Sequence, residues 1–450
     1  MDRFLLEKYD VPAPRYTSYP TVPYWQKTPP TQAAWLEQVQ LSFDKNDEIS
    51  LYIHLPFCEK LCTYCACNKK ITKRHKVELP YIEALLQEWK IYTDALPSRP
   101  KLKTLHIGGG TPTFFSPENL KKLFGGIFAF ADVAPNHEFS FEAHPNNTTR
   151  EHLKVLHQLG FNRVSVGVQD VDEEILSLIN RHQTLEAVER VTQQARAIGY
   201  RSVNFDLIFG LPKQTKRHIV KTIKAVKRLY PDRIAFYSYA HVPWKSKWQQ
   251  AYDQKDLPMG MQKRALYELG KRLLEQIGYS GIGMDHFALK SDELWAASEN
   301  GTLHRNFMGY TNRHTDLMIG LGASAISDSW TAFAQNEKKV KFYQGCVADG
   351  ALPIIKGHLL NREDQVLRQH ILNLSCRFES CWEDPALYHP SLMDAQIRWK
   401  PMEADGLIEC SYKGIKVLPI GRAFIRNICM AMDARLWQGK MEKQLFSQSV

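Results

Sequence analysis

Short apolar runs alternate with amphipathic segments along the chain from residue 49 onward. The apolar runs are rich in β-branched and aromatic residues, which favours strands. They lie at 50–55, 103–107, 138–143, 162–168, 202–209 and 233–239, with a further candidate within 277–287. Apolar residues recur at helical spacing in the segments between them, at 80–92, 151–160, 184–199 and 218–230. Another helix is predicted to begin where Ser116, a suitable N-cap, is followed by Pro117 and Glu118.

This alternation predicts an α/β fold with parallel strands joined by crossover helices. Six such units indicate a partial (β/α)6 barrel of the TIM type. In barrels of this kind, chemistry takes place at the carboxyl ends of the strands. Polar residues follow the predicted strands at this end, namely Gly108–Thr111, Glu142, Gln169, Asp206 and His241. We therefore expect these residues to converge on one site.

The pattern differs before and after the predicted barrel. We assign residues 1–45 to an N-terminal arm that acts as a lid, 46–345 to the barrel and 346–450 to a C-terminal domain. Two prolines and two tyrosines in PRYTSYP (14–20) disfavour a helix there. The C-terminal domain combines helical patterns with a hairpin that turns at Lys413–Gly414, which suggests a mainly helical, winged-helix-like shape (362–374, 406–419 and 421–436).

Composition narrows the class of protein. The chain has 450 residues, of which 44% are hydrophobic and 24% charged, as is ordinary for a globular protein in water. It contains no run of 18 apolar residues, so no membrane span is expected, and MDRFLLEKYD lacks the apolar core of a signal peptide. An odd number of cysteines, several of them clustered, favours a reducing compartment and hence the cytoplasm.

The formal net charge of +10 is compatible with a nucleic acid or with a small polyanionic substrate. The densest basic stretch is KKITKRHK (69–76), which we interpret as a solvated loop face. No DNA- or RNA-binding pattern occurs in the sequence, so we expect no nucleic-acid partner.

Four cysteines lie within ten residues of one another, directly after the first strand. Cys58, Cys62 and Cys65 have the spacing C-x3-C-x2-C, and Cys67 follows. Three thiolates held this close can bind three irons of an iron–sulfur cube and leave the fourth iron open to a small molecule. Structural zinc is the alternative, but such sites usually have a second ligand pair, and the remaining five cysteines are scattered. A disulfide scaffold is disfavoured by the length of the chain.

The second motif is LHIGGGTPT (105–113), which has three glycines after a strand. Glycine allows the backbone to approach a ligand closely. The motif is neither a P-loop nor a dinucleotide fingerprint, because it lacks both G-K-[ST] and G-x-G-x-x-G.

Together, HLPFCEKLCTYC and LHIGGGTPT resemble the radical S-adenosylmethionine enzymes. Further motifs run in order along nearly the whole chain, and the complete set resembles the family of oxygen-independent coproporphyrinogen III oxidases (dehydrogenases) of haem synthesis. These motifs are PRYTSYP (14–20), CTYCACNK (62–69), FEAHP (141–145), GVQD (167–170), INRHQ (179–183), FDLIFGLPKQT (205–215), YAHVP (239–243), GMDHFA (283–288), HRNFMGYT (304–311), GASAIS (322–327) and IRNICM (425–430).

The resemblance implies two cofactors, a 4Fe–4S cluster and S-adenosylmethionine at two sites. Cys58, Cys62 and Cys65 match the cluster ligands, whereas Cys67 matches a cysteine that is not counted as a ligand. Residues that match the first S-adenosylmethionine site are Tyr52, Gly109, Glu142 and Ile326. Residues that match the second site are Tyr64, Gly110, Thr111, Gln169, Arg181, Asp206 and Ala240. The resemblance assigns no catalytic side chain.

The implied activity is that of an oxidoreductase that uses a 5′-deoxyadenosyl radical. It converts two propionates of coproporphyrinogen III to vinyl groups, giving protoporphyrinogen IX, with an external electron donor and acceptor. A closed barrel with its own lid needs no second subunit, so a monomer is expected. We hypothesise that Arg15, Arg305 and Arg426 hold substrate carboxylates. The chain departs from familiar members at His144, where they carry Asp, and in a slightly shorter loop at 311–316.

Three other functions are considered. One is a radical enzyme on the same scaffold that acts on another tetrapyrrole, and another is a haem chaperone with the same barrel. Cys67 and the PRYTSYP arm argue against both. The third, a zinc-stabilised nucleic-acid binder, rests only on the net charge and the winged-helix-like tail.

Overall fold

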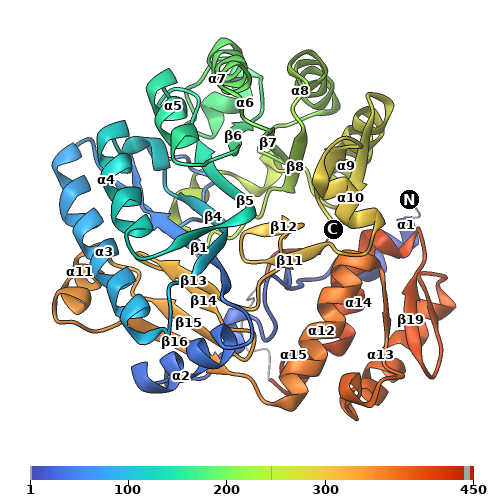
Figure 1. The fold of residues 1–450 in the computed structure, drawn as a ribbon. Coiled ribbons are helices and arrows are strands. Elements are labelled where there is room, and N and C mark those ends of the chain that lie inside the picture. Colours follow the sequence, from blue (N-terminus) through green and yellow to red (C-terminus); the bar gives the residue numbers. More distant parts are fainter. Residues whose placement is uncertain (1–2, 245, 440–445, 450) are drawn as a thin grey trace.

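A twelve-stranded sheet forms the centre of the computed structural model, which describes residues 3–244, 246–439 and 446–449 (Figure 1). The ends of the predicted arm and C-terminal domain, residues 1–2, 440–445 and 450, lie outside the described residues. Along the sheet, the strands are β16 (Ile354–Leu359), β15 (Ala332–Asn336), β14 (Ile326–Asp328), β13 (Met318–Leu321), β1 (Glu48–Leu55), β4 (Lys101–Gly109), β5 (Asp132–Ala143), β6 (Arg163–Gln169), β7 (Ser202–Phe209), β8 (Arg233–Ser238), β10 (His286–Leu289) and β9 (Tyr279–Ile282).

The strands β1, β4, β5, β6, β7 and β8 pair in parallel in this order, which confirms the predicted barrel units. Strand β13 also pairs in parallel with β1. Antiparallel strands extend the sheet at both edges, through β14 to β16 on one side and through β10 and β9 on the other. The segment 277–287 thus contributes to a hairpin rather than to another parallel unit.

Helices cover the outer face of the parallel strands (Figure 1). Ser116 caps α4 as expected, since its hydroxyl accepts a hydrogen bond from Asn119 N at 3.2 Å. Gly199 ends α7 in the left-handed conformation, with φ +111°. The helices of this layer and of the adjoining loops are α3 (Glu78–Ala95), α4 (Pro117–Phe128), α5 (Arg150–Gln158), α6 (Glu173–Leu178), α7 (Leu185–Ile198), α8 (Lys216–Leu229), α9 (Gly260–Gln276), α10 (Glu293–Glu299) and α11 (Val340–Ala348).

Pairing of β15 with β16 carries the sheet past residue 345 to Leu359. Beyond it, the C-terminal domain packs helices against a small sheet in the order β17-β19-β18. Its hairpin turns between Cys410 and Gly414, as predicted. Its elements are α12 (Arg362–Arg377), β17 (Glu379–Cys381), α13 (Ser391–Ala404), β18 (Ile408–Cys410), β19 (Gly414–Val417), α14 (Ile425–Met432) and α15 (Ala434–Gln438).

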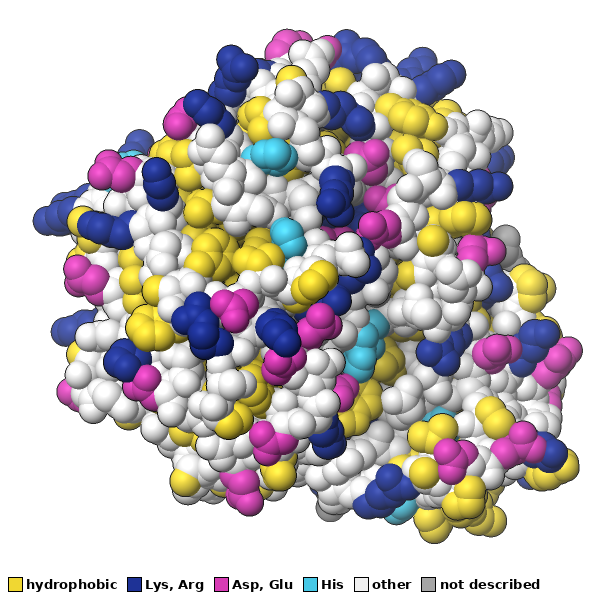
Figure 2. All heavy atoms as spheres, in the orientation of Figure 1, with side chains coloured by type: hydrophobic (Ala, Val, Ile, Leu, Met, Phe, Trp, Pro, Cys, Tyr) yellow, Lys and Arg dark blue, Asp and Glu magenta, His cyan; other side chains and the backbone are white. Residues whose placement is uncertain are grey.

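The closing helix expected over 421–436 is interrupted. A 3-10 turn precedes α14, and Asp433 separates α14 from α15 because its carboxylate caps the second helix by accepting from Leu436 N at 2.9 Å. On the outer surface of this domain, Met393 and Ile397 of α13 are exposed, and Figure 2 shows hydrophobic side chains gathered there.

The N-terminal arm joins the two parts of the molecule. Helix α2 (Gln32–Phe43) packs Trp35 into the core around the large sheet. By contrast, α1 (Arg3–Tyr9) and the extended segment after it place Tyr9, Tyr16 and Tyr19 in the core of the C-terminal domain. The segment 14–20 is not helical, as its prolines predict.

Candidate functional site

The cysteine loop is closed at its base by a short parallel pair between β2 (Phe57–Cys58) and β3 (Lys70–Ile71). Inside the loop, Lys69 Nζ donates hydrogen bonds to the carbonyl oxygens of Cys65 at 2.8 Å and Cys67 at 3.3 Å. Asn180 Nδ2 donates to Leu61 O at 2.6 Å and thereby ties the loop to the segment after α6. Hydrogen bonds from the Lys69 and Asn180 side chains to backbone carbonyls therefore help to hold the cysteine loop in place.

Cys58, Cys62 and Cys65 are free, partly buried thiols on the wall of a cavity of about 370 Å³ at the carboxyl ends of the parallel strands. Burial raises the pKa of Cys58 to about 11. The hydrogen bond from Cys67 lowers the pKa of Cys65 to about 6, and Lys69 acts in the same direction.

The donor set fits an iron–sulfur cluster better than a single ion. Among the described residues, the only group of three His, Cys, Asp or Glu side chains whose ligand atoms all lie within 4.8 Å of one another is Asp172, Glu174 and His218. The three thiols are therefore more widely spread, as suits a cluster in which each sulfur binds a different iron. Asp172 already pairs with Lys221 at 2.8 Å and caps α6, so this group is a solvated surface cluster.

The glycine loop after β4 is bound directly to the cysteine loop. Gly110 N donates to Leu55 O at 2.8 Å, and the Thr111 hydroxyl lies 3.4 Å from Cys58 Sγ. A Cβ on Gly110 would lie 2.6–2.8 Å from backbone atoms of residues 55–57. A Cβ on Gly109, whose φ is +108°, would meet the ring of His54 at 2.4 Å. Only glycine fits this approach of the two loops.

Two carboxylates, from β5 and β7, face the same cavity. Burial acts to raise the pKa of Glu142, but hydrogen bonds from His106 and from Gly109 N, the latter at 3.1 Å, hold it below its usual range. Asp206 accepts hydrogen bonds from Ser165 Oγ at 2.8 Å and Asn204 Nδ2 at 2.9 Å, and burial raises its pKa to about 6.

Arg181 brings a buried positive charge next to the cysteines. Its Nε donates to Gln183 Oε1 at 2.8 Å, and its Nη1 lies 3.6 Å from Cys62 Sγ and 3.5 Å from Tyr64 Oη. Gln169 closes β6 with φ +66°, which turns the chain at the cavity wall. These groups offer a cation, a neutral amide and carboxylates within one enclosure, a set that can bind a zwitterionic amino acid and ribose hydroxyls.

The structure gathers most of the predicted site residues around this cavity. Those that line it are Cys58, Cys62, Cys65, Tyr64, Gly109, Gly110, Thr111, Glu142, Gln169, Arg181 and Asp206. His241, also expected at this end of the strands, does not line it, and neither do three residues that match the S-adenosylmethionine sites. Tyr52 bonds His54 Nδ1 at 3.0 Å, the Ala240 carbonyl is joined to that of Tyr64 through the Gln249 amide, and Ile326 packs beside the cluster of Trp25 and Phe333.

Sequence reasoning missed other lining residues, notably Lys69, Asn146, Asn147 and Tyr237. Tyr237 could have been found, since it lies near the end of a predicted strand. His144, the departure noted above, also lines the cavity, and burial lowers its pKa to about 3, so it is neutral there.

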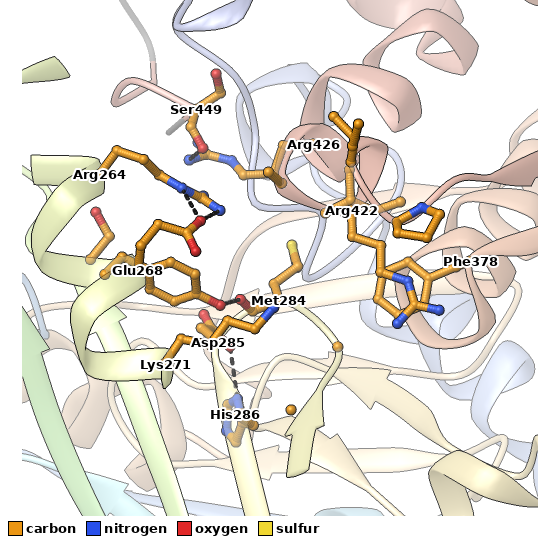
Figure 3. A pocket seen from close by; sticks show the side chains of 18 of the residues that line it. Arg264, Glu268, Lys271, Met284, Asp285, His286, Phe378, Arg422, Arg426 and Ser449 are labelled. Atoms are coloured by element: carbon orange, nitrogen blue, oxygen red, sulfur yellow. Dashed lines mark hydrogen bonds and ion pairs between the residues drawn. The ribbon is translucent and has the colours of Figure 1, made fainter. Parts of the chain in front are cut away.

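A second, larger cavity of about 790 Å³ lies between α9, the β9–β10 turn and the C-terminal domain (Figure 3). Its six cationic side chains are Arg15, Arg264, Lys271, Arg305, Arg422 and Arg426. The rings of Tyr237, from the first cavity, and His286, from the second, are 5.6 Å apart. The two cavities are therefore neighbours.

All three hypothesised carboxylate clamps have backbone partners, and two of them have more than one. Arg305 Nη1 donates to the carbonyls of Arg15 at 2.6 Å and Tyr16 at 3.0 Å. Arg426 donates to the carbonyls of Ala13 and Pro14 in the arm, as well as to residues near the C-terminus. Arg15 donates only to Ser238 O, at 2.9 Å, among the hydrogen bonds of the described residues.

The parallel strands and the cysteine-lined cavity at their carboxyl ends define a radical S-adenosylmethionine protein, and the sequence model of the Radical SAM superfamily matches residues 52–226. The chain belongs to the family of oxygen-independent coproporphyrinogen III oxidases. It is 39% identical to the member from Pseudomonas aeruginosa and 37% identical to that from Escherichia coli K12, in each case over 100% of this chain and 98% of the relative.

The fold agrees with this membership. The solved structure of coproporphyrinogen III oxidase from Escherichia coli, described as a radical SAM enzyme, superimposes with a TM-score of 0.89 and 36% identity. The match covers 96% of this chain and 98% of that one. Within the part of the chain that the structure describes, no helix is both long and apolar enough to cross a membrane.

Proposed function

We propose that this protein oxidatively decarboxylates two propionates of coproporphyrinogen III to vinyl groups without oxygen, giving protoporphyrinogen IX. The observation that carries the proposal is the single cavity on which three thiols, the glycine loop, Arg181 and two strand-end carboxylates converge. The full-length relatedness to the family supports the choice of substrate.

Cys58, Cys62 and Cys65 would hold a 4Fe–4S cluster, which, when bound with S-adenosylmethionine, supplies a carbon radical by one-electron reductive cleavage. Tyr52, Gly109, Glu142 and Ile326 are proposed for one S-adenosylmethionine. For the second, we propose Tyr64, Gly110, Thr111, Gln169, Arg181, Asp206 and Ala240. The charge of Arg181 suits a carboxylate group, and Asp206 suits ribose hydroxyls.

The chain's own residues exclude water from the chemistry, which matters because a carbon radical abstracts hydrogen from any close donor. Hydrogen bonds from Arg305 and Arg426 hold the arm near the barrel and the C-terminal domain. A lid is thus built from segments at opposite ends of the chain.

We infer that the second cavity receives substrate carboxylates. Its six cations outnumber its four carboxylates, Glu268, Glu275, Asp285 and Asp405, which suits a polyanion, and Arg15 retains donors for a ligand. Arg305 and Arg426 would then act indirectly, by positioning the arm that carries Arg15. We further propose that the protein works in the cytoplasm as a monomer, with an external electron donor and acceptor.

The test is an anaerobic turnover assay with reconstituted protein, S-adenosylmethionine, dithionite, an electron acceptor and coproporphyrinogen III. Mass spectrometry should detect 5′-deoxyadenosine and a product that has lost two carboxyl groups, and Cys62→Ala should abolish both. 5′-Deoxyadenosine without decarboxylation would mean that the substrate is another tetrapyrrole. Tight haem binding without either product would mean that the protein is a haem carrier.

A further inference from the structure

A group of exposed cations surrounds the outer side of the cysteine loop. We call it the basic face and define it by its exposed lysines and arginine, Lys60, Lys70, Lys73, Arg74, Lys76, Lys338, Lys339 and Lys341. Two segments that are far apart in sequence form it. Asn68 Nδ2 donates to Lys338 O at 2.9 Å, and Tyr81 of α3 contacts Tyr343 of α11 with ring centroids 5.6 Å apart.

These charges are not neutralised locally. Within the described residues, none of the eight cations forms an ion pair, whereas many other surface lysines and arginines do, such as Lys90 with Asp94 and Arg99 with Asp132. The adjoining carboxylates have other partners or none among these side chains: Glu59 precedes Lys60 without an ion pair to it, Glu337 accepts from the backbone N of Lys339 at 2.8 Å, and the buried Glu78 pairs with His75 at 2.7 Å. The basic face therefore carries a concentrated positive potential toward solvent.

Apolar side chains are exposed among these charges. Ile71 is 44% exposed and Phe342 is 54% exposed. Exposed apolar side chains contribute nothing to the solubility of a charged surface. Protein interfaces, by contrast, combine an apolar centre with a polar rim.

The basic face adjoins the proposed cluster ligands directly. Lys70 pairs with Phe57 in β2, Thr72 N donates to Cys58 O at 2.9 Å, and Lys69 bonds the carbonyls of Cys65 and Cys67. Cys67 itself is exposed. A partner seated on this face would thus lie only a few bonds from the thiols that line the cavity.

We propose that the basic face docks an acidic protein that carries one electron at a time. This inference rests on the proposed function, which consumes one external electron for each S-adenosylmethionine cleaved. In the transfer, the partner's reduced centre loses one electron and the cluster held by Cys58, Cys62 and Cys65 gains it, with no bond made or broken. Complementary charge speeds encounter and orients the partner's centre toward the cysteine loop.

The test measures binding of an oxidised plant-type 2Fe–2S ferredoxin of net negative charge to the reconstituted holoenzyme by interferometry. The triple variant Lys70→Glu, Lys73→Glu, Arg74→Glu should raise the dissociation constant by at least about tenfold, and added salt should weaken wild-type binding. The matched control reverses the charge of three exposed lysines of α8, on another part of the barrel (Figure 1). Its substitutions are Lys216→Glu, Lys224→Glu and Lys227→Glu. It makes the same change in net charge and should leave the dissociation constant within about twofold of wild type.

A second readout separates the two proposals. Dithionite should drive 5′-deoxyadenosine formation equally in wild type and both variants, whereas ferredoxin should drive it poorly only in the basic-face variant. No 5′-deoxyadenosine with dithionite in the wild type would refute the proposed function. The docking proposal is overturned if ferredoxin shows no salt-sensitive binding to the wild type or if both triple variants bind it alike. It is also overturned if the basic-face variant loses affinity for RNA or for phosphatidylglycerol vesicles while keeping its affinity for ferredoxin.

Discussion

At the scale of single residues, burial and hydrogen bonds give the cysteines of the site different pKa values. Cys58, Cys62 and Cys65 are equivalent in the sequence motif, yet burial raises the pKa of Cys58 while the hydrogen bond from Cys67 lowers that of Cys65. Cys67 is more exposed than these three thiols, although it lines the same cavity. The four thiols therefore differ in environment, and we expect them to differ in their importance for iron binding.

Replacing Cys65 by alanine should remove most of the bound iron, because two thiolates hold a cluster poorly. Cys67→Ala, in the same loop, should keep iron and sulfide at wild-type levels after identical reconstitution. Chemical analysis of iron and sulfide measures both. Equal loss in the two variants would mean that Cys67 is itself a ligand.

The pKa of about 6 at Asp206 predicts how binding depends on pH. A carboxylate accepts hydrogen bonds from ribose hydroxyls in its ionised form, so affinity at the second S-adenosylmethionine site should be full above pH 6. Below it, affinity should fall by about tenfold per pH unit. Equilibrium dialysis measures this, and Asp206→Asn should give a weaker but flat profile. Parallel profiles for the two proteins would contradict the assignment.

At the scale of elements, two glycines differ in how much space surrounds them. Gly125 lies on the exposed side of α4, and nothing lies within 4 Å of an added Cβ. Gly110 lies where the glycine loop meets the cysteine loop, and its Cβ would press on backbone atoms. Helix propensity governs the first position and steric fit governs the second.

Gly125→Ala should therefore raise the free energy of unfolding by roughly 0.5–1 kcal/mol. Gly110→Ala should lower it by about 1–3 kcal/mol, since neither loop can retreat without breaking its hydrogen bonds. Urea unfolding under the same conditions measures both. A neutral Gly110→Ala would show that the loops are not closely packed.

At the scale of the whole molecule, contacts between the two ends of the chain close the structure. Arg426, in the C-terminal domain, donates to the carbonyls of Ala13 and Pro14 in the arm and to Gln448 and Ser449 near the C-terminus. Burial, together with the neighbouring cations Arg15 and Arg305, lowers its pKa to about 9. Arg426 thus contacts the arm and the segment near the C-terminus at the same time.

Arg426→Ala should speed amide hydrogen exchange in residues 9–19 by at least about tenfold, because hydrogen bonds to a charged group contribute roughly 1.5–3 kcal/mol each. Arg422→Ala is the control, since Arg422 lines the same cavity but packs against Phe378. Unchanged exchange in the Arg426 variant would show that the tyrosines of the arm hold it without the guanidinium.

The sequence by itself determined the local features of this protein. Residue type and spacing are enough to predict the six parallel strands, the Ser116 cap, the hairpin at Lys413–Gly414 and the cysteine motif, because strand, cap and turn preferences act over a few residues. The convergence of Glu142, Gln169 and Asp206 on one cavity could also be predicted, because parallel strands present their carboxyl ends at the same edge of a sheet.

Only the tertiary structure determined the features that depend on contacts between distant segments of the chain. The antiparallel edges of the sheet, the cationic second cavity, the arm held by Arg426 and the approach of Lys338 to the cysteine loop all depend on contacts between residues far apart in sequence. The local sequence pattern of KKITKRHK is the same for a solvated loop and for a docking face. The position of this segment beside the thiols favours the proposed docking face, because charge acts through space rather than along the chain.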